Sequence, residues 1–326
     1  MLIINAITAA NRSTRPEAAS NLKNHLNGFE IYCIILKIMN LNVSLYIPVY
    51  NGESTIEKVI NSVLKLSYSP NEIIIINDGS TDNTKNIINK YKGKIKIIDN
   101  KINKGLGYCR NLGIKQSLNE NVASIDADVE VHNNWLKDLV ELKDKYQSSI
   151  CGGELIEKYI DNNMCNYWRH IHARQNPFGI RDIENLNQAL AGSNILLNKN
   201  AWESAGGYEE KFKTHGEDFT FCNKLRSLNF KISYSSKAKC YHLRNDTLMS
   251  LANASRRAYI YGAGLKKPTF MKFVQRSIRH LKGFVVNSMS DFVNLRFKLI
   301  YVSFVILINH IIKEFISFIK KKPDYV

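Results

Sequence analysis

Short apolar runs alternate with longer, helix-like segments from residue 43 to residue 125. Apolar runs of this length fit strands that are buried on both faces, and helices between such strands indicate crossover connections. Crossovers within one sheet are right-handed and make the strands they join parallel. The pattern predicts an α/β fold with a mostly parallel, Rossmann-like sheet flanked by helices. The expected strands are 43–49, 73–76, 95–98 and 122–125, and the expected helices are 54–66, 84–91 and 107–117.

The regular alternation stops on both sides of this region. The first forty residues show neither strand alternation nor a long helical stripe. An aromatic and polar segment, 159–185, comes before the next apolar strand at 189–197, and the sequence beyond His242 is helical and basic. The expected parts are an N-terminal extension over 1–40, a folded domain over 41–245 and a basic, amphipathic helical tail over 246–326.

The formal net charge is +16, and most of it lies near the C-terminus. Residues 256–326 hold fourteen Lys and Arg against three Asp and Glu, which gives +11. Such a charge indicates a polyanionic partner, and nucleic acid, an anionic membrane and a phosphorylated substrate all qualify. We expect no nucleic-acid partner, because the sequence has no helix-turn-helix, zinc-finger or RNA-recognition pattern.

The stretch Leu299–Ile312 is apolar but only fourteen residues long, and a lysine flanks it on each side. A membrane span needs roughly twenty apolar residues, so we do not expect this stretch to cross a bilayer. Its polar residues fall on one side at helical spacing, with Phe304, Ile308 and Phe315 broadly opposite. The pattern predicts an amphipathic helix that either packs on the protein or lies in a membrane interface.

The six cysteines form no Cys-x-x-Cys pair, so we expect reduced thiols and no structural zinc site. Residues 1–30 lack the apolar core of a signal peptide, and Ile31–Met39 is too short to span a bilayer. We therefore expect a cytoplasmic protein, either free or attached peripherally to the cytoplasmic face of a membrane.

Two acids, Asp126 and Asp128, close an apolar strand on either side of Ala127. Side chains repeat every two residues in an extended chain, so both carboxylates can face the same side. Mg²⁺ and Mn²⁺ prefer oxygen ligands and are usually held by one or two carboxylates together with substrate phosphates. The motif indicates a divalent-metal site, and a solvated turn is the alternative.

Other strand ends and glycine turns also carry polar residues. Asp78 precedes Gly79, where its carboxylate can accept hydrogen bonds from a nucleobase or ribose, or serve the turn alone. Arg110 lies in the first turn of a helix that follows two glycines, which suits a phosphate or a surface ion pair. The glycine spacing there does not match a dinucleotide-binding fingerprint.

Glu217 and Asp218 precede an expected helix over 219–228 and lie near its positive end. Helix capping explains both acids, and the functional alternative makes Asp218 a general base. His242 ends an apolar-polar run, where it can complete a metal shell or be a simple strand-end histidine.

Taken together and in order, these pieces resemble the family 2 glycosyltransferases, which have the A-type nucleotide-sugar fold. The resemblance spans about Val43 to His242. It rests on the ordered set SLYIPVYNGE (44–53), IIINDGSTDNT (74–84), NKGLGYCRNLGI (103–114), SIDADVEV (124–131), AGSNILLNKNAWESAGGYEEKF (191–212), GED (216–218) and the strand that ends at His242.

The resemblance implies a role for each matched position. The catalytic base would be Asp218, with Glu217 facing the acceptor, and the metal would be held by Asp128 and His242. The domain 41–245 would divide into a nucleotide-binding half, 41–130, and an acceptor half, 131–245. The nucleotide-sugar site would be formed by Pro48, Tyr50, Glu53, Asp78, Arg110, Asp126, Ala127 and Asn194.

The family implies an enzyme that uses Mn²⁺ or Mg²⁺ and transfers a sugar, with inversion, from a nucleotide-diphosphate sugar to an acceptor hydroxyl. We expect a UDP-sugar as donor and a carbohydrate or lipid-linked acceptor, in the synthesis of cell-surface polysaccharide or glycolipid. The Q-x-x-R-W motif of processive members is absent, which favours transfer of single sugars.

Two features bear on the rival functions. Asn77 replaces the first of two aspartates common in the family, which leaves Asp78 as the matched acid. One rival is a catalytically silent module that binds a nucleotide sugar, although Asp128 and Asp218 are both present. The other is a nucleotidyltransferase, which would need a basic glycine-rich loop where Asn51-Gly52-Glu53 is acidic.

Overall fold

The structure, a computed structural model, describes residues 41–161, 163–173, 181–262 and 269–320. Asn42–Val326 form one compact unit. The expected extension over 1–40, including the apolar stretch Ile31–Met39, lies outside the described residues. The five described cysteines are buried and free, as expected for reduced thiols.

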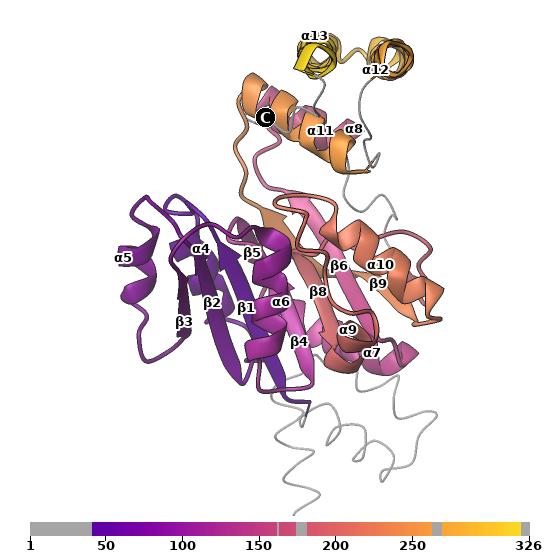
Figure 1. Ribbon diagram of the computed structural model, residues 1–326. Helices are drawn as coiled ribbons and strands as arrows, with labels where there is room; N and C mark the ends of the chain where they lie inside the picture. Colours follow the sequence, from indigo (N-terminus) through magenta and orange to yellow (C-terminus); the bar gives the residue numbers. More distant parts are fainter. Residues whose placement is uncertain (1–40, 162, 174–180, 263–268, 321–326) are drawn as a thin grey trace, which may run out of the picture. The chain divides into compact units, whose positions relative to one another are not determined.

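The first half of the sheet is parallel, as the sequence predicts (Figure 1). The sheet begins in the order β3-β2-β1-β4. β1, β2 and β4 are buried along nearly their whole length, whereas the edge strand β3 is only partly buried, and each crossover contains a helix. The strands are β1 (Val43–Val49), β2 (Glu72–Asp78), β3 (Lys96–Asn100) and β4 (Asn121–Ile125), and the helices are α4 (Ile56–Val63), α5 (Thr84–Asn89) and α6 (Leu106–Gln116).

The second half of the sheet is mixed. β8 (Asn194–Asn198) runs antiparallel to both β4 and β6 (Ile150–Glu157). β9 (Ile232–His242) runs parallel to β6 and antiparallel to two short strands, β5 (Val129–Val131) and β7 (Asp182–Ile183). Parallel pairing thus dominates only where strands follow one another through helical crossovers.

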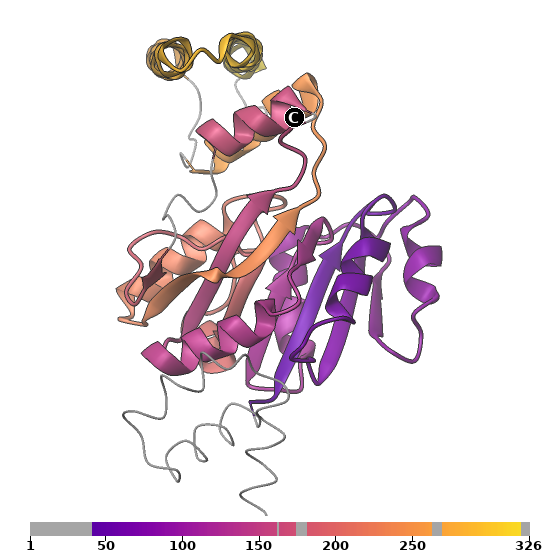
Figure 2. The same ribbon diagram turned by 180° about the vertical axis from the view of Figure 1, so that it is seen from behind.

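Helices cover both faces of this sheet (Figures 1 and 2). On one face, α6, α9 (Lys199–Ser204) and α10 (Glu217–Ser227) enclose the main hydrophobic core. Tyr46 and Ile76 of the sheet pack there with Ile114 of α6 and Leu225 of α10. α4 and α7 (Trp135–Tyr146) lie on the opposite face. Burying a large apolar side chain of this kind contributes about 1.5–3 kcal/mol, so this core fixes the helices against the sheet.

Helices also make up most of the described tail. They are α11 (Leu248–Gly262), α12 (Phe270–Val293) and α13 (Phe297–Lys320). A further helix, α8 (Met164–His172), lies in the segment where the sequence shows no clear pattern, and the Asn163 side chain caps it by accepting from Cys165 N at 2.8 Å. α8, α11 and α13 share a second hydrophobic cluster, which includes Trp168, Leu251 and Val302.

The length argument against a membrane span at Leu299–Ile312 is wrong. α13 is 24 residues long, and by length and composition it is apolar enough to cross a membrane. The flanking lysines, Lys298 and Lys313, lie inside the helix because lysine has a high helix propensity. About 39% of the most apolar window of α13 is buried in the protein, so the helix also packs on its neighbours.

Candidate active site

The sheet topology brings several predicted site residues to one edge. β8 runs antiparallel to β4 with Asn194 opposite Ile125, so the residues before Asn194 lie beside those that follow β4. β9 runs antiparallel to β5 with Val129 opposite His242. The loop 126–128 therefore lies between the start of β8 and the end of β9.

Arg110 connects three separate stretches of the chain at this edge. It lies in α6 with 1% of its surface exposed. Its Nη2 donates to Asp126 Oδ1 at 3.0 Å, and its Nε donates to Glu217 Oε1 at 3.1 Å. Its Nη1 donates to the Gly192 carbonyl at 2.9 Å and to Ser124 Oγ at 3.1 Å. Burial would lower the pKa of Arg110, but Asp126 and Glu217 raise it well above its ordinary value. The guanidinium is therefore a fixed cation between two carboxylates.

Asp218 lies in the first turn of α10, on the other side of Gly192. Its Oδ1 accepts from Phe219 N at 2.7 Å and its Oδ2 accepts from Gly192 N at 3.3 Å. Gly192 thus bonds to Asp218 through its amide and to Arg110 through its carbonyl. A Cβ at this glycine would lie 2.9 Å from Arg110 Cζ, so the close approach needs glycine. Asp218 is partly exposed, which leaves its carboxylate open to another group.

Glu217, the neighbour of Asp218, is 2% exposed and turned toward Arg110. Burial, and then the charge of Asp218, raise the pKa of Glu217 to about 7, while Arg110 opposes that shift. The resemblance predicts that Glu217 contacts an acceptor, but its carboxylate is buried in this arrangement and is not exposed to one. The observed partner of the side chain is Arg110.

Asp128 and His242 lie together at the same edge. His242 Nε2 is 3.3 Å from Asp128 Oδ2, and the Asp128 side chain is 36% exposed. Burial would raise the pKa of Asp128, but His242 lowers it to about 2. Burial would lower the pKa of His242, but Asp128 and Glu157 raise it to about 9. At neutral pH the two predicted metal ligands are thus an ionised carboxylate and a protonated imidazole, which would lose its Nε2 proton on binding a cation.

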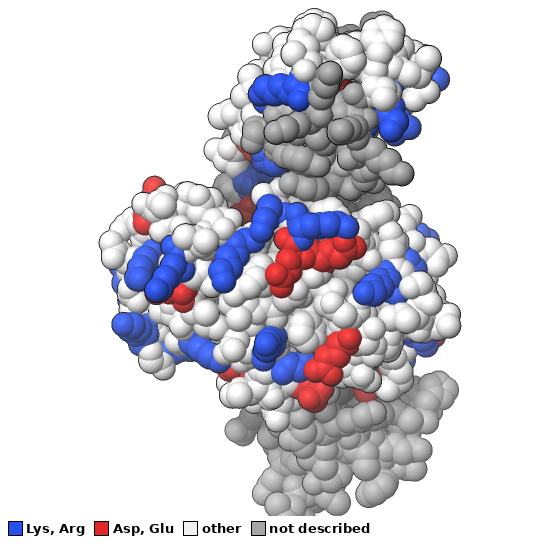
Figure 3. Space-filling view, viewed as in Figure 1, with Lys and Arg blue, Asp and Glu red and all other residues white. Residues whose placement is uncertain are grey.

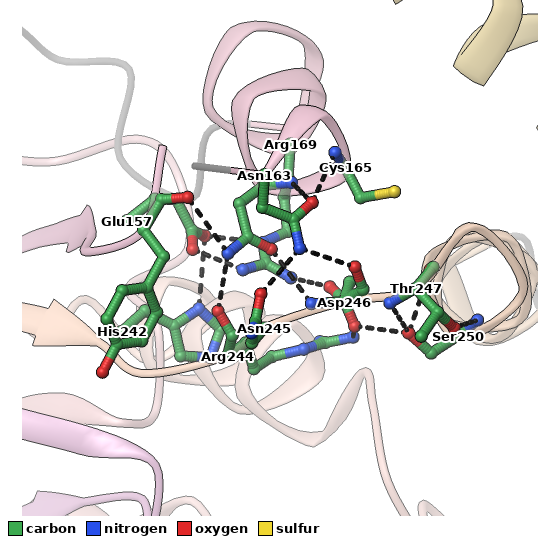
Figure 4. Close-up of polar contacts among 12 residues, drawn as sticks. Glu157, Asn163, Cys165, Arg169, His242, Arg244, Asn245, Asp246, Thr247 and Ser250 are labelled. Carbon is green, nitrogen blue, oxygen red and sulfur yellow. Dashed lines mark hydrogen bonds and ion pairs between the residues drawn. The ribbon is translucent and has the colours of Figure 1, made fainter. Parts of the chain in front are cut away.

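A chain of buried polar contacts extends from His242 into the helical region (Figure 4). Glu157, at the end of β6, accepts from His242 Nδ1 at 3.2 Å and from Arg169 Nε at 2.7 Å. Arg169 of α8 also pairs with Asp246, which precedes α11 and accepts from Arg244 Nη2 at 2.9 Å. Burial would raise the pKa of Glu157, but His242 and Arg169 lower it to about 2.

No pattern in the sequence predicts this polar chain. Glu157 and Arg169 belong to no motif, and they are separated from His242 by more than seventy residues. The pairing of β6 with β9, in which Glu157 lies opposite His242, brings them together. The one available signal is that Glu157 and His242 each end a strand. It becomes useful only once β6 and β9 are known to be neighbours in the sheet.

Asp78 is almost fully enclosed by the loop before α6. It is 3% exposed, and its two oxygens accept from Lys104 N at 2.9 Å, Gly105 N at 2.8 Å and Asn100 Nδ2 at 2.7 Å. The carboxylate therefore orders the loop that leads to Arg110. A nucleobase or ribose that bound Asp78, as expected, would have to donate to oxygens that already accept these hydrogen bonds.

The loops that follow β1 and β2 are joined by hydrogen bonds. Asn51 Oδ1 accepts from Thr81 N at 2.8 Å, and Glu53 Oε2 accepts from Asn83 N at 2.9 Å. Gly52 N donates to Thr84 Oγ1 at 2.8 Å. Glu53, predicted to line the nucleoside pocket, thus also holds these two loops in a fixed relation.

The remaining predicted residues differ in exposure. Tyr50 is 52% exposed and presents a free ring face, whereas Asn194 is 1% exposed and accepts from Trp135 Nε1 at 2.6 Å. Pro48 is buried beyond the last β1–β4 pair, where a missing N–H is tolerated. Ala127 lies beside the loop after β1, because a Cβ at Gly52 would be 3.6 Å from the Ala127 Cβ.

Within the described residues no group of three or more His, Cys, Asp or Glu side chains is arranged to hold a metal. Asp128 and His242 do offer one carboxylate oxygen and one imidazole nitrogen close together. A cation that takes most of its ligands from substrate phosphates and water needs no more protein ligands than this. The donor set therefore fits Mn²⁺ or Mg²⁺ bound together with a diphosphate.

A family model described as Glycosyl transferase family 2 matches residues 44–206, half of the chain. The chain belongs to the family 2 glycosyltransferases. The matched region holds every predicted site residue except Glu217, Asp218 and His242. The sequence predicts an α/β sheet flanked by helices and membership of this family. Both predictions are confirmed.

Curated relatives include enzymes of polysaccharide synthesis. The poly-β-1,6-N-acetyl-D-glucosamine synthase of Staphylococcus epidermidis is 30% identical over 220 residues, which cover 64% of this chain and 52% of that protein. This family 2 chain therefore spans about half the length of the synthases it matches. An uncharacterized glycosyltransferase of Rickettsia prowazekii is 26% identical over 76% of this chain and 78% of its own length.

Solved structures share the fold. Residues 1–349 of TarS from S. aureus superpose with a TM-score of 0.53 at 20% identity, covering 86% of this chain and 92% of that chain. The mannosyltransferase PcManGT from Pyrobaculum calidifontis, solved with GDP-Man and Mn²⁺, gives a TM-score of 0.57 at 12% identity and covers 84% of this chain and 87% of its own.

Proposed function

We propose that this chain is an inverting, metal-dependent glycosyltransferase that moves a single sugar from a UDP-sugar to an acceptor hydroxyl. The observation that carries the proposal is the arrangement around Gly192, whose carbonyl accepts from the Arg110 that holds Asp126 and whose amide donates to Asp218. The donor-side acid and the proposed base are thus linked by three hydrogen bonds, through Arg110 and Gly192. The match of a UDP complex of TarS to this fold, with a TM-score of 0.51, is consistent with a UDP-sugar donor.

Asp218 is the proposed general base. Its carboxylate is partly exposed and accepts only backbone amides, so it has lone pairs available for a hydroxyl proton. Glu217 and Arg110 form a buried ion pair behind it, and we assign them a positioning role. The acceptor oxygen would give its proton to Asp218 and displace the nucleotide diphosphate in one step, which inverts the anomeric carbon.

Asp128 and His242 are the proposed metal ligands, and Glu157 orients the histidine through its Nδ1. A divalent cation bound there would neutralise the charge that develops on the leaving diphosphate. Tyr50 is the exposed ring available to a nucleobase. Proposed domain limits follow from these roles, with 41–130 as the nucleotide-binding half, 131–245 as the acceptor half and 246–326 as the tail.

The acceptor class is part of the proposal. The relatives that make poly-β-1,6-N-acetyl-D-glucosamine support a carbohydrate or lipid-linked acceptor in cell-surface polysaccharide synthesis. Transfer of single sugars and location at the cytoplasmic face of a membrane stay predictions from the sequence.

The test is the pair Asp218→Asn and Asp161→Asn, of which the second replaces an exposed turn residue. We expect Asp218→Asn to lower the turnover of UDP-sugars about 10²- to 10⁴-fold, measured as release of UDP, with UDP affinity by calorimetry unchanged. Asp161→Asn should keep both values. Equal loss of turnover and UDP binding in Asp218→Asn would contradict its role as base.

A further inference from the structure

The helices α12 and α13 expose their apolar side chains. Of the 25 large hydrophobic residues that are exposed in the described chain, seventeen lie in 270–319. On α13 they form one stripe at helical spacing, and α12 adds a second such stripe. The α13 stripe consists of Tyr301, Phe304, Ile308, Ile312, Phe315 and Ile319.

The buried sides of the same helices carry charged and polar residues, which on α13 lie among apolar ones such as Val302. Glu314 of α13 is fully buried and pairs with Arg256 of α11 and with Arg276 of α12. Ser303 accepts from Trp168 Nε1 at 2.7 Å. Asp291 of α12, also fully buried, lies 2.9 Å from His172 Nε2. These contacts fix which side of each helix faces the protein.

Charged residues buried opposite an exposed apolar stripe are not expected for a surface helix in water. Such a helix buries its apolar stripe and exposes its charged side. Contiguous apolar surface of this extent marks a contact with a partner or a membrane. Since ion pairs and hydrogen bonds hold the inward sides of α12 and α13 against the protein, the outward sides need a separate apolar environment.

The exposed charges of these helices all have one sign. The two acids of 269–320, Asp291 and Glu314, are both buried. Exposed basic side chains border the apolar stripes, and in Figure 3 the corresponding surface is mostly uncharged with lysine and arginine at its edges. They are Arg279, Lys282, Lys298 and Lys320. An apolar face with a basic border matches the boundary between acyl chains and anionic headgroups.

We propose that α12 and α13 form a two-helix membrane-docking surface that lies in the interface of an anionic bilayer, with its apolar stripes in the acyl region. Of the two positions that the sequence left open for the C-terminal helix, α13 then takes both, with one side packed on the protein and the other in the membrane interface. A second copy of the chain does not fit as well, because two such surfaces would bring like charges together. The proposal is independent of the proposed reaction, because membrane contact requires neither donor nor acceptor.

The experiment is flotation of the full chain with phosphatidylcholine vesicles and with vesicles that contain phosphatidylglycerol. The test variant is I308S/I312S/F315S, and the matched control, L64S/L118S/L228S, removes three exposed apolar side chains elsewhere. Thermal unfolding and UDP affinity are measured on both, so that a folding defect or a failure of the proposed function is recognised separately.

We expect the unaltered chain and the control to float with the anionic vesicles, and the test variant to lose at least about 100-fold in partition. Binding should weaken in phosphatidylcholine alone and in high salt. Equal partition of the two variants would overturn the proposal, as would dimerisation through this face without vesicle binding. Resistance of the bound chain to carbonate extraction would also overturn it, because it would show a spanning helix.

Discussion

Arg110 Nη2 donates to Asp126 Oδ1 across 3.0 Å, which joins a buried helical arginine to the first acid of the Asp-Ala-Asp motif. The same guanidinium holds Glu217 and the Gly192 carbonyl. A planar group with five donors can serve these acceptors together, and a lysine ammonium cannot reproduce that geometry.

Arg110→Lys should therefore leave at least one buried carboxylate without its partner. We expect a loss of roughly 3–5 kcal/mol in the free energy of unfolding and a fall of about 100-fold in turnover. Chemical denaturation and UDP release measure the two effects. The matched control is Arg226→Lys in α10, a partly exposed arginine whose hydrogen bonds lie near the surface and for which we expect a change within about 0.5 kcal/mol.

Gly192→Ala should move Arg110, because the added Cβ would lie 2.9 Å from its Cζ. We expect destabilisation of about 1–3 kcal/mol with reduced turnover. Gly283→Ala is the control, since a Cβ there meets nothing within 4 Å and the residue lies inside α12. That change should stabilise the chain by about 0.5–1 kcal/mol. Similar melting shifts in both variants would contradict the close approach at Gly192.

Glu157→Gln tests whether the buried acid orients His242. The outer partner of a metal-bound histidine typically contributes 10- to 100-fold in metal affinity, so we expect the Mn²⁺ concentration needed for UDP binding to rise by about that factor. Calorimetric titration of UDP at a series of Mn²⁺ concentrations measures it. Glu154→Gln, three residues earlier on β6, should bind Mn²⁺ and UDP normally. A loss of UDP affinity that is independent of Mn²⁺ would contradict the orienting role.

Glu314→Gln should destabilise the helical region in a pH-dependent way. Burial would raise the pKa of Glu314, but His280 and Arg256 lower it to about 2, below the ordinary value of 4.5. The ionised carboxylate therefore contributes stability that is fully present above pH 4.5 and is lost as the pH falls toward 2. We expect a deficit of roughly 3–5 kcal/mol at pH 7 that narrows below pH 4.5.

Thermal melts of the parent chain, Glu314→Gln and the exposed control Glu203→Gln measure this difference. A deficit that stays constant down to pH 3 would show that the charge of Glu314 is not what stabilises the helices.

The first half of the fold is predictable because its elements are local. β1 occupies the predicted residues 43–49, and α6 lies within one residue of its prediction. Apolar runs bounded by helices fix such strands without any knowledge of distant partners. The second half depends on non-local pairing. Whether β8 runs antiparallel between β4 and β6 is decided by contacts between residues far apart in the sequence.

The same distinction applies to the site. Asp126, Asp128 and Asp218 were found because they stand in short local patterns, whereas Glu157 and Arg169 act only through strand order and helix packing. The side of α13 that faces the protein is also not predictable from local sequence. Helical periodicity separates Phe304 from Ser303, but contacts with distant residues, such as the hydrogen bond from Trp168 to Ser303, show which of them faces inward.

The bridge that Arg169 makes between Glu157 and Asp246 has a practical consequence for shortened versions of the enzyme. A chain cut after β9 keeps every predicted catalytic residue, yet it removes Asp246 and leaves Arg169 one counter-ion short in a dry environment. The histidine that Glu157 holds then loses part of its support. The minimal unit for this chemistry thus extends beyond the family's matched segment, at least to Asp246 just before α11.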